Sequence, residues 1–90
     1  MKASFRAHGR VQGVGFRYLV RQEAQALGLA GWVRNNPDGS VEGEAGGDFS
    51  RLEALQAFLR AGPGRSRVSR LDWNASTGGE SLPQTFEIRS

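Results

Sequence analysis

Residues 30–46 read AGWVRNNPDGSVEGEAG, and the other predicted elements are arranged around this segment. Residues 30–35 are compatible with a β-strand, and residues 40–46 alternate apolar or small side chains with glutamates, which is typical of a half-exposed strand. Between them, residues 36–39 are Asn-Pro-Asp-Gly, a strong turn signal because proline presets φ and glycine tolerates positive φ. This stretch therefore predicts a β-hairpin.

A helix is predicted on each side of this hairpin. Before it, apolar residues recur at helical spacing over residues 16–27, and Gly28 follows as a C-terminal cap. After it, Asp48 is a suitable N-cap, and an apolar stripe over residues 49–59 runs up to the helix-ending segment Gly-Pro-Gly at 62–64. The hairpin is therefore flanked by two amphipathic helices.

Strands are predicted at the two ends of this arrangement. Residues 3–9 read as the first strand, and residues 66–76 as a long strand whose apolar face is poorly phased. After the glycine pair at 78–79, residues 85–89 alternate as a short last strand. This order predicts an α+β, ferredoxin-like βαββαβ sandwich: an antiparallel sheet with two helices on one face and a short extra C-terminal strand.

Length and composition narrow the class of protein. A chain of 90 residues has the length of one domain, and we treat residues 1–90 as a single domain. Cysteine is absent, which excludes disulfides and thiolate metal sites, and a single histidine, His8, argues against a zinc or haem site. We therefore expect no metal and no cofactor.

Hydropathy and charge bear on location and partners. No apolar run approaches a membrane span and the N-terminus lacks a signal pattern, so we expect a cytoplasmic protein without membrane contact. Nothing in the sequence suggests more than a monomer. The net charge is +3, and because Lys2 is the one lysine among 12 basic residues, the other 11 are arginines. Arginine matches phosphate and carboxylate geometry. This charge fits an anionic substrate or a nucleic acid, and by itself chooses neither.

The loop between the first strand and the first helix, residues 9–17, reads GRVQGVGFR. Its three glycines let the backbone curl so that its amides, with those of the helix N-terminus, can converge on an anion. The loop lacks the Gly-Lys-Ser/Thr end of a Walker motif, and Tyr18 stands where a dinucleotide motif needs glycine. On these residues alone, a phosphate cradle and a plain flexible connection remain equally open.

Two segments carry a resemblance to a known family. Residues 9–17, followed by residues 28–35 and 38–43, resemble the two signature segments of acylphosphatases, in the same order and spacing. The resemblance implies an enzyme that hydrolyses the carboxyl–phosphate bond of small acyl phosphates. Its partners would be a small-molecule acyl phosphate as substrate and inorganic phosphate as product and competitor.

The resemblance also implies roles for individual residues. Arg17, which closes the first motif, would hold the substrate phosphate together with backbone amides of the loop. These phosphate-binding residues are Gln12, Gly13, Val14, Gly15, Phe16 and Arg17. Asn35, which ends the second motif, would orient the attacking water, while its neighbour Asn36 should point to the other face of the strand. An asparagine cannot take a proton at neutral pH, so Asn35 can only position the water.

The other notable residues are better explained by structure than by catalysis. We expect His8 to be solvated or hydrogen-bonded. We expect the tryptophans, Trp32 and Trp73, to be packing residues, and the glutamates, Glu42 and Glu44, to form a solvated face. The arginines at 65, 67 and 70 are expected to be a surface cluster rather than a second anion patch. The chain ends Arg89-Ser90 without the aromatic residue often seen in the family, which leaves open whether the C-terminus contacts the site.

Two other functions are considered. A ferredoxin-like module that binds RNA or another anion without catalysis would need exposed aromatic residues on the two central strands, and glutamates there are unfavourable, so we expect no nucleic-acid partner. A regulatory or maturation module that binds carbamoyl phosphate would resemble acylphosphatase-type domains of larger proteins. The length of 90 residues argues against it.

Overall fold

The computed structural model describes residues 1–76 and 81–90. The elements in chain order are β1 (Lys2–Arg10), α1 (Phe16–Ala26), β2 (Ala30–Asn35), β3 (Val41–Gly46), α2 (Phe49–Arg60), β4 (Arg67–Ser76) and β5 (Phe86–Arg89). Every predicted element is present in the predicted order, so the βαββαβ arrangement with an extra C-terminal strand is confirmed. The glycine break predicted at residues 78–79 lies outside the described residues.

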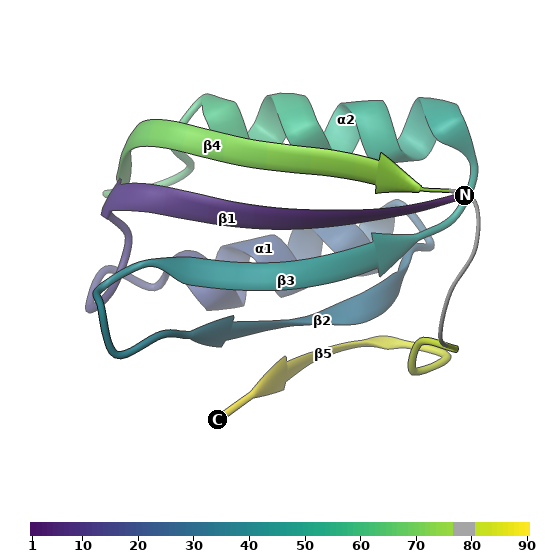
Figure 1. Ribbon diagram of the computed structural model, residues 1–90, viewed down its shortest axis with the longest axis horizontal. Coiled ribbons are helices and arrows are strands. Elements are labelled where there is room, and N and C mark those ends of the chain that lie inside the picture. Colours follow the sequence, from purple (N-terminus) through teal and green to yellow (C-terminus); the bar gives the residue numbers. More distant parts are fainter. Residues whose placement is uncertain (77–80) are drawn as a thin grey trace.

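The five strands form one sheet in the order β4-β1-β3-β2-β5, and both helices cover the same face of it (Figure 1). The first four strands pair antiparallel, as predicted, but β5 pairs in parallel with β2, so the sheet is mixed. The topology explains the difference. Strand β4 ends at the side of the molecule where β2 begins (Figure 1), so a strand that starts there runs in the direction of β2.

The core lies between the sheet and the helices. Helix α1 buries Phe16, Val20 and Ala24, which recur every fourth residue, as helical spacing requires. In the strands the buried side chains alternate, and in β3 the buried positions are 41, 43 and 45. Strand β4 buries only Leu71 because it is an edge strand, which accounts for its poorly phased sequence. No helix in the described part of the chain is long and apolar enough to cross a membrane.

The topology brings the two sequence motifs to the same end of the molecule. Strands β1 and β2 both end there, and α1 begins there (Figure 1). The loop of residues 11–15 that follows β1 therefore lies close to the last residue of β2, Asn35.

Candidate active site

The loop conformation depends on two glycines. Gly13 and Gly15 have φ angles of 74° and 78°, and Gly15 is the N-cap residue of α1. Residues with side chains are strained in this left-handed region, whereas glycine is not. A Cβ at either position would meet nothing within 4 Å, so glycine is required for its backbone freedom and not for lack of space.

The backbone amides of this loop are free to bind an anion. The first amide of α1 with an acceptor is that of Leu19, which donates to the Gly15 carbonyl at 3.1 Å. Among the described residues, the amides of residues 12–18 have no acceptor. The first turn of α1 contains no acidic residue, and no side chain caps it. Unpaired amides together with the positive end of the helix dipole favour a bound anion.

A hollow of about 190 Å³ opens beside these amides. Its lining residues are Val11, Gly13, Gly15, Phe16, Arg17, Tyr18, Asn35 and Ile88. It thus brings together Arg17 from the first motif and Asn35 from the second, which are 18 residues apart in sequence. In the described part of the chain, its lining contains no carboxylate and no histidine.

Arg17 is half-buried and is held by the C-terminal strand. Its Nη1 donates to the Arg89 carbonyl oxygen at 3.4 Å, and Ile88 of the same strand lines the hollow. The sequence left open whether the C-terminus contacts the site, and the contact is made through the backbone. Sequence reasoning missed both residues, because it predicted the strand and not that β5 would lie beside β2.

Asn35 retains hydrogen-bonding capacity that the fold does not use. It lies on the same face of β2 as the buried residues Gly31 and Val33. Its side-chain Oδ1 is buried and has no hydrogen-bond partner among the described residues. Buried polar atoms are usually paired, so an unpaired one in the wall of a hollow is available to a ligand. Asn36 does not line the hollow, and its Nδ2 donates to the Ser40 hydroxyl at 3.0 Å within the turn.

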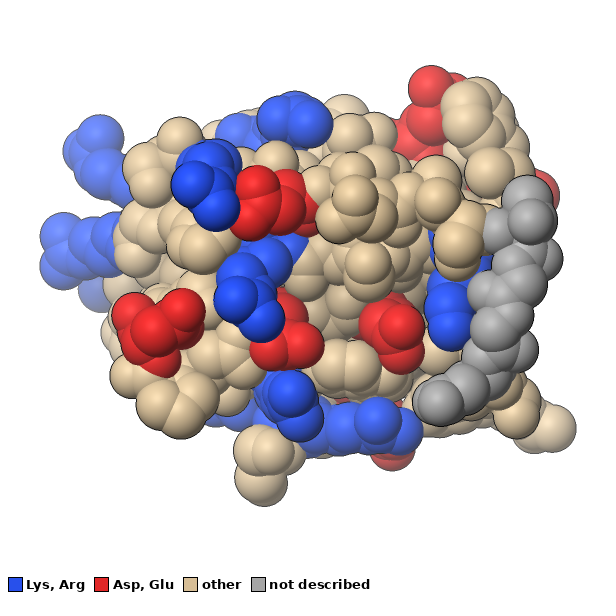
Figure 2. Space-filling model, viewed as in Figure 1, with Lys and Arg blue, Asp and Glu red and all other residues tan. Residues whose placement is uncertain are grey.

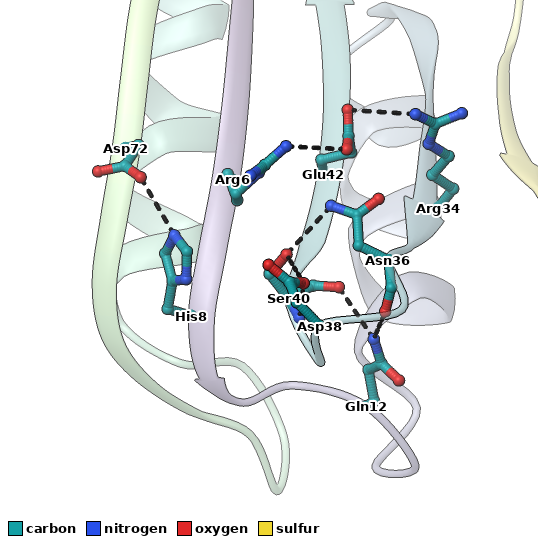
Figure 3. Close-up of polar contacts among 9 residues, drawn as sticks. All are labelled: Arg6, His8, Gln12, Arg34, Asn36, Asp38, Ser40, Glu42 and Asp72. Atoms are coloured by element: carbon teal, nitrogen blue, oxygen red, sulfur yellow. Dashed lines mark hydrogen bonds and ion pairs between the residues drawn. The ribbon is translucent and has the colours of Figure 1, made fainter.

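The side chain of Gln12 ties the loop to the hairpin. Its Nε2 donates to the carbonyl oxygens of Asn36 at 2.8 Å and Ser40 at 2.9 Å (Figure 3). The turn itself is ordered by Asp38, which accepts from the Ser40 hydroxyl at 2.6 Å and from its amide at 2.9 Å. These hydrogen bonds hold the pKa of Asp38 below its usual value. The sequence suggested only a role for the Gln12 amide, and this side-chain contact was missed.

The two glutamates of β3 lie on the open face of the sheet, opposite the helices. Glu42 pairs with Arg6 at 3.2 Å and with Arg34 at 3.6 Å (Figure 3), and Glu44 pairs with Lys2 at 3.6 Å. Both are half-buried, so the expected solvated face is present but only partly exposed. They are nevertheless not a catalytic carboxylate pair, because neighbouring cations balance each of them.

His8 and one of the clustered arginines meet on the same open face. His8 Nε2 lies 3.1 Å from Asp72 Oδ2, which confirms the expectation of a hydrogen-bonded histidine (Figure 3). Arg70 donates twice to the same carboxylate, at 3.1 and 3.0 Å. These bonds, that of Arg70 first and that of His8 second, lower the pKa of Asp72. Arg70 is therefore held in an ion pair on the open face, which separates it from Arg65 and Arg67, with which the sequence grouped it.

The two tryptophans pack, as expected. Trp73 stacks on Phe5 with ring centroids 6.1 Å apart and planes 18° from parallel. Trp32 lies under the guanidinium groups of Arg34 and Arg89, at 5.3 and 5.1 Å from the ring centroid. Neither ring is a fully exposed stacking platform.

Comparisons of this chain with family models, curated proteins and solved structures all lead to the same family. The family model described as Acylphosphatase matches residues 3–88. An acylphosphatase of Thermococcus kodakarensis is 48% identical over 80 residues, which cover 87% of this chain and 88% of the relative. The crystal structure of acylphosphatase from Bacillus subtilis matches with a TM-score of 0.93 and 37% identity, covering 99% of this chain and 98% of that one. Full-length HypF in its phosphate- and nucleotide-bound form matches with a TM-score of 0.84 and 28% identity, over 99% of this chain and 12% of that chain.

Proposed function

The chain belongs to the acylphosphatase family of enzymes, and we propose that it hydrolyses small acyl phosphates to a carboxylate and inorganic phosphate. One observation carries the proposal: unpaired loop amides, the Arg17 guanidinium and the unpartnered amide of Asn35 all meet at one hollow. The volume of about 190 Å³ suits a phosphoryl group with a small acyl part.

The phosphoryl group would be bound by the loop. The amides of residues 12–17 and the Arg17 guanidinium donate hydrogen bonds to its oxygens, and each charge-assisted bond contributes roughly 1.5–3 kcal/mol. The same donors stabilise the charge that develops on these oxygens during phosphoryl transfer. The contact between Arg17 and the Arg89 carbonyl supports this role, because it restricts the guanidinium to the mouth of the hollow.

Asn35 would position the attacking water. Its Oδ1 accepts a hydrogen bond from the water, and the water oxygen attacks phosphorus in line with the bond to the carboxylate. That P–O bond breaks, the carboxylate leaves with the electron pair, and the water's proton passes to a phosphoryl oxygen. A carboxylate is a good leaving group, so the step needs no general acid and fits a lining without carboxylate or histidine among the described residues.

The finer properties of the protein belong to the same proposal. The enzyme acts without metal or cofactor, as a cytoplasmic monomer. Support for a monomer comes from the open sheet face, which consists largely of ion pairs such as Arg6–Glu42 and His8–Asp72 rather than apolar side chains. Size-exclusion chromatography with light scattering tests this directly, and a stable dimer at micromolar concentration would contradict it.

The RNA-binding alternative has less support. On the open face, the described parts of the central strands β1 and β3 carry charged and polar residues and no aromatic side chain. A second candidate is a phosphate-binding module without turnover, because the chain also resembles a part, 12% of the length, of HypF, a larger protein whose structure was solved in a phosphate- and nucleotide-bound form.

A single assay separates catalysis from binding alone. Purified protein is incubated with benzoyl phosphate in EDTA, and loss of the acyl phosphate is followed by its ultraviolet absorbance. We expect turnover above the spontaneous rate, unaffected by EDTA and inhibited competitively by inorganic phosphate. Phosphate binding without turnover would instead support the binding module.

A further inference from the structure

A second hollow lies on the other side of the phosphate loop. It measures about 630 Å³ and is lined by Arg10, Gly13, Val14, Arg65 and Arg67. Gly13 also lines the hollow that contains Arg17 and Asn35, so the two hollows are adjacent and share part of one wall. A ligand that is longer than a phosphate could therefore reach from one hollow into the other.

The positive charges of the three arginines in this hollow are not neutralised by carboxylates of the described residues. Arg10, Arg65 and Arg67 are exposed, and no carboxylate lies within ion-pair distance of them among residues 1–76 and 81–90. By contrast, Arg6 and Arg70 on the open sheet face are both paired with carboxylates. Figure 2 shows basic side chains protruding at the end of the molecule where β1 ends and β4 begins.

The strand register makes this arrangement unfavourable for the fold. Arg10 of β1 lies directly opposite Arg67 of β4. Like charges at opposed positions of an antiparallel pair are destabilising. Arg65, in the turn before β4, adds a third positive charge to the same hollow. An anion bound among the three guanidinium groups would relieve this repulsion.

We propose that Arg10, Arg65 and Arg67 form a subsite for a second anionic group on the acyl part of the substrate. The inference rests on the proposed function and refines it: the preferred substrates are acyl phosphates whose acyl part carries a further phosphate. Phosphate suits the subsite better than a single carboxylate, because a dianion with three acceptor oxygens can bind more than one guanidinium fork.

The test compares three acyl phosphates whose leaving groups are all aryl carboxylates of the benzoate type. Benzoyl phosphate has an uncharged acyl part, and 3- and 4-phosphonobenzoyl phosphate add a phosphonate at two distances from the reacting bond. We expect the wild-type protein to have a higher kcat/KM for at least one phosphonate substrate than for benzoyl phosphate. The preference should fall as ionic strength rises, because the guanidinium groups are exposed.

Variants of the subsite should remove this preference selectively. In Arg67→Gln we expect the preference to fall by about fivefold, and in Arg65→Gln/Arg67→Gln by about tenfold or more, at an unchanged kcat/KM for benzoyl phosphate. Arg70→Gln is the matched control. It lies on the same strand and removes the same charge, but Arg70 is already paired with Asp72, so the preference should persist.

Three outcomes would overturn the inference: no wild-type preference, an equal loss for all three substrates in Arg67→Gln, or the same loss of preference in Arg70→Gln. Each would leave the proposed function intact, provided that the wild type hydrolyses benzoyl phosphate. A wild type that hydrolyses none of the three substrates would contradict the proposed function itself, and with it the subsite.

Discussion

At the scale of single residues, Asn35 combines a buried, unpartnered side-chain oxygen with a position in the wall of the hollow. A buried polar atom without a partner costs roughly 1–3 kcal/mol of stability. We therefore expect Asn35→Leu, which removes that atom at similar volume, to unfold at an equal or higher urea concentration than wild type. Asn36→Ala is the control: it loses the bond to Ser40 and should be destabilised by about 1 kcal/mol. A clearly destabilised Asn35→Leu would show that Asn35 serves the fold.

Gln12 is the second residue with a testable role, since its side chain joins the loop of residues 11–15, the proposed phosphate loop, to the hairpin turn. Gln12→Ala loses two hydrogen bonds, and we expect a loss of about 1–2 kcal/mol in the free energy of unfolding together with weaker inhibition by phosphate. Gln25→Ala is the control. It also loses a bond to a backbone carbonyl, that of Phe86, but Gln25 does not line the hollow. Equal phosphate inhibition in both variants would contradict a positioning role for Gln12.

The residues of the site were only partly predictable. Arg17 and Asn35 were identified from their motifs, and the structure brings them to one hollow. The Gln12 side chain, Ile88 and the Arg89 carbonyl were not identified, because their contacts join segments 24 to 72 residues apart. Local sequence patterns carry the spacing within one helix or strand, whereas such contacts depend on how the elements pack.

At the scale of elements, the start of α1 depends on the left-handed backbone of Gly15, with φ of 78°. We expect Gly15→Ala to lose about 1–2 kcal/mol of stability. Phosphate protection against thermal unfolding should also weaken, because the strain redirects the first amides of the helix. Differential scanning fluorimetry with and without phosphate measures both effects.

Gly28→Ala provides the control at the other end of the same helix. Gly28 has a similar φ of 69°, so a comparable loss of stability is expected. Phosphate protection should remain at the wild-type level, since Gly28 is not part of the hollow. If both variants lost phosphate protection equally, the effect would come from the stability of α1 and not from the geometry of its first turn.

The pairing of β5 shows what element prediction could not supply. The alternation at residues 85–89 predicted a strand, and β5 forms at Phe86–Arg89. The strand with which β5 pairs, and its direction, depend on which edge of the sheet is free and on where β4 ends. Neither of these two features can be predicted from the local sequence. In the proposed mechanism the parallel pairing matters because it brings the Arg89 carbonyl within reach of Arg17.

At the scale of the whole molecule, three exposed carboxylates link stability to pH. Hydrogen bonds lower the pKa values of Asp38, Asp48 and Asp72 below 3.8, in each case because a neighbouring donor favours the charged form. Since the folded pKa lies below the unfolded one, this stability is present above pH 3.8 and is lost as pH falls through the lowered values.

We therefore expect the melting temperature to fall with acidification below about pH 4, and to fall less in Asp72→Asn. Asp72→Asn should be less stable than wild type at neutral pH, because it loses the charged partner of Arg70 and His8. The two proteins should converge at low pH, where Asp72 itself is protonated. A constant difference between them down to about pH 2 would contradict the linkage.

The overall fold was largely predictable because helical spacing, the hairpin and the turn signals all agreed on one arrangement. The grouping of the charged side chains on the surface was harder to predict from the sequence. The arginines at 65, 67 and 70 are close in sequence, but Arg70 pairs with Asp72 while Arg10 joins the other two. Alternation along a strand and pairing across strands decide such groupings, and only the first can be predicted from local sequence.

The central claim is that Arg17 and the loop amides hold the phosphate while Asn35 holds the water. Its most direct test is the turnover number of Asn35→Ala with saturating benzoyl phosphate in EDTA, measured together with the inhibition constant of inorganic phosphate. We expect a loss in kcat of at least about a hundredfold with phosphate inhibition within about threefold of wild type. Near-normal turnover in Asn35→Ala, or a loss of phosphate binding as large as that of Arg17→Ala, would contradict it.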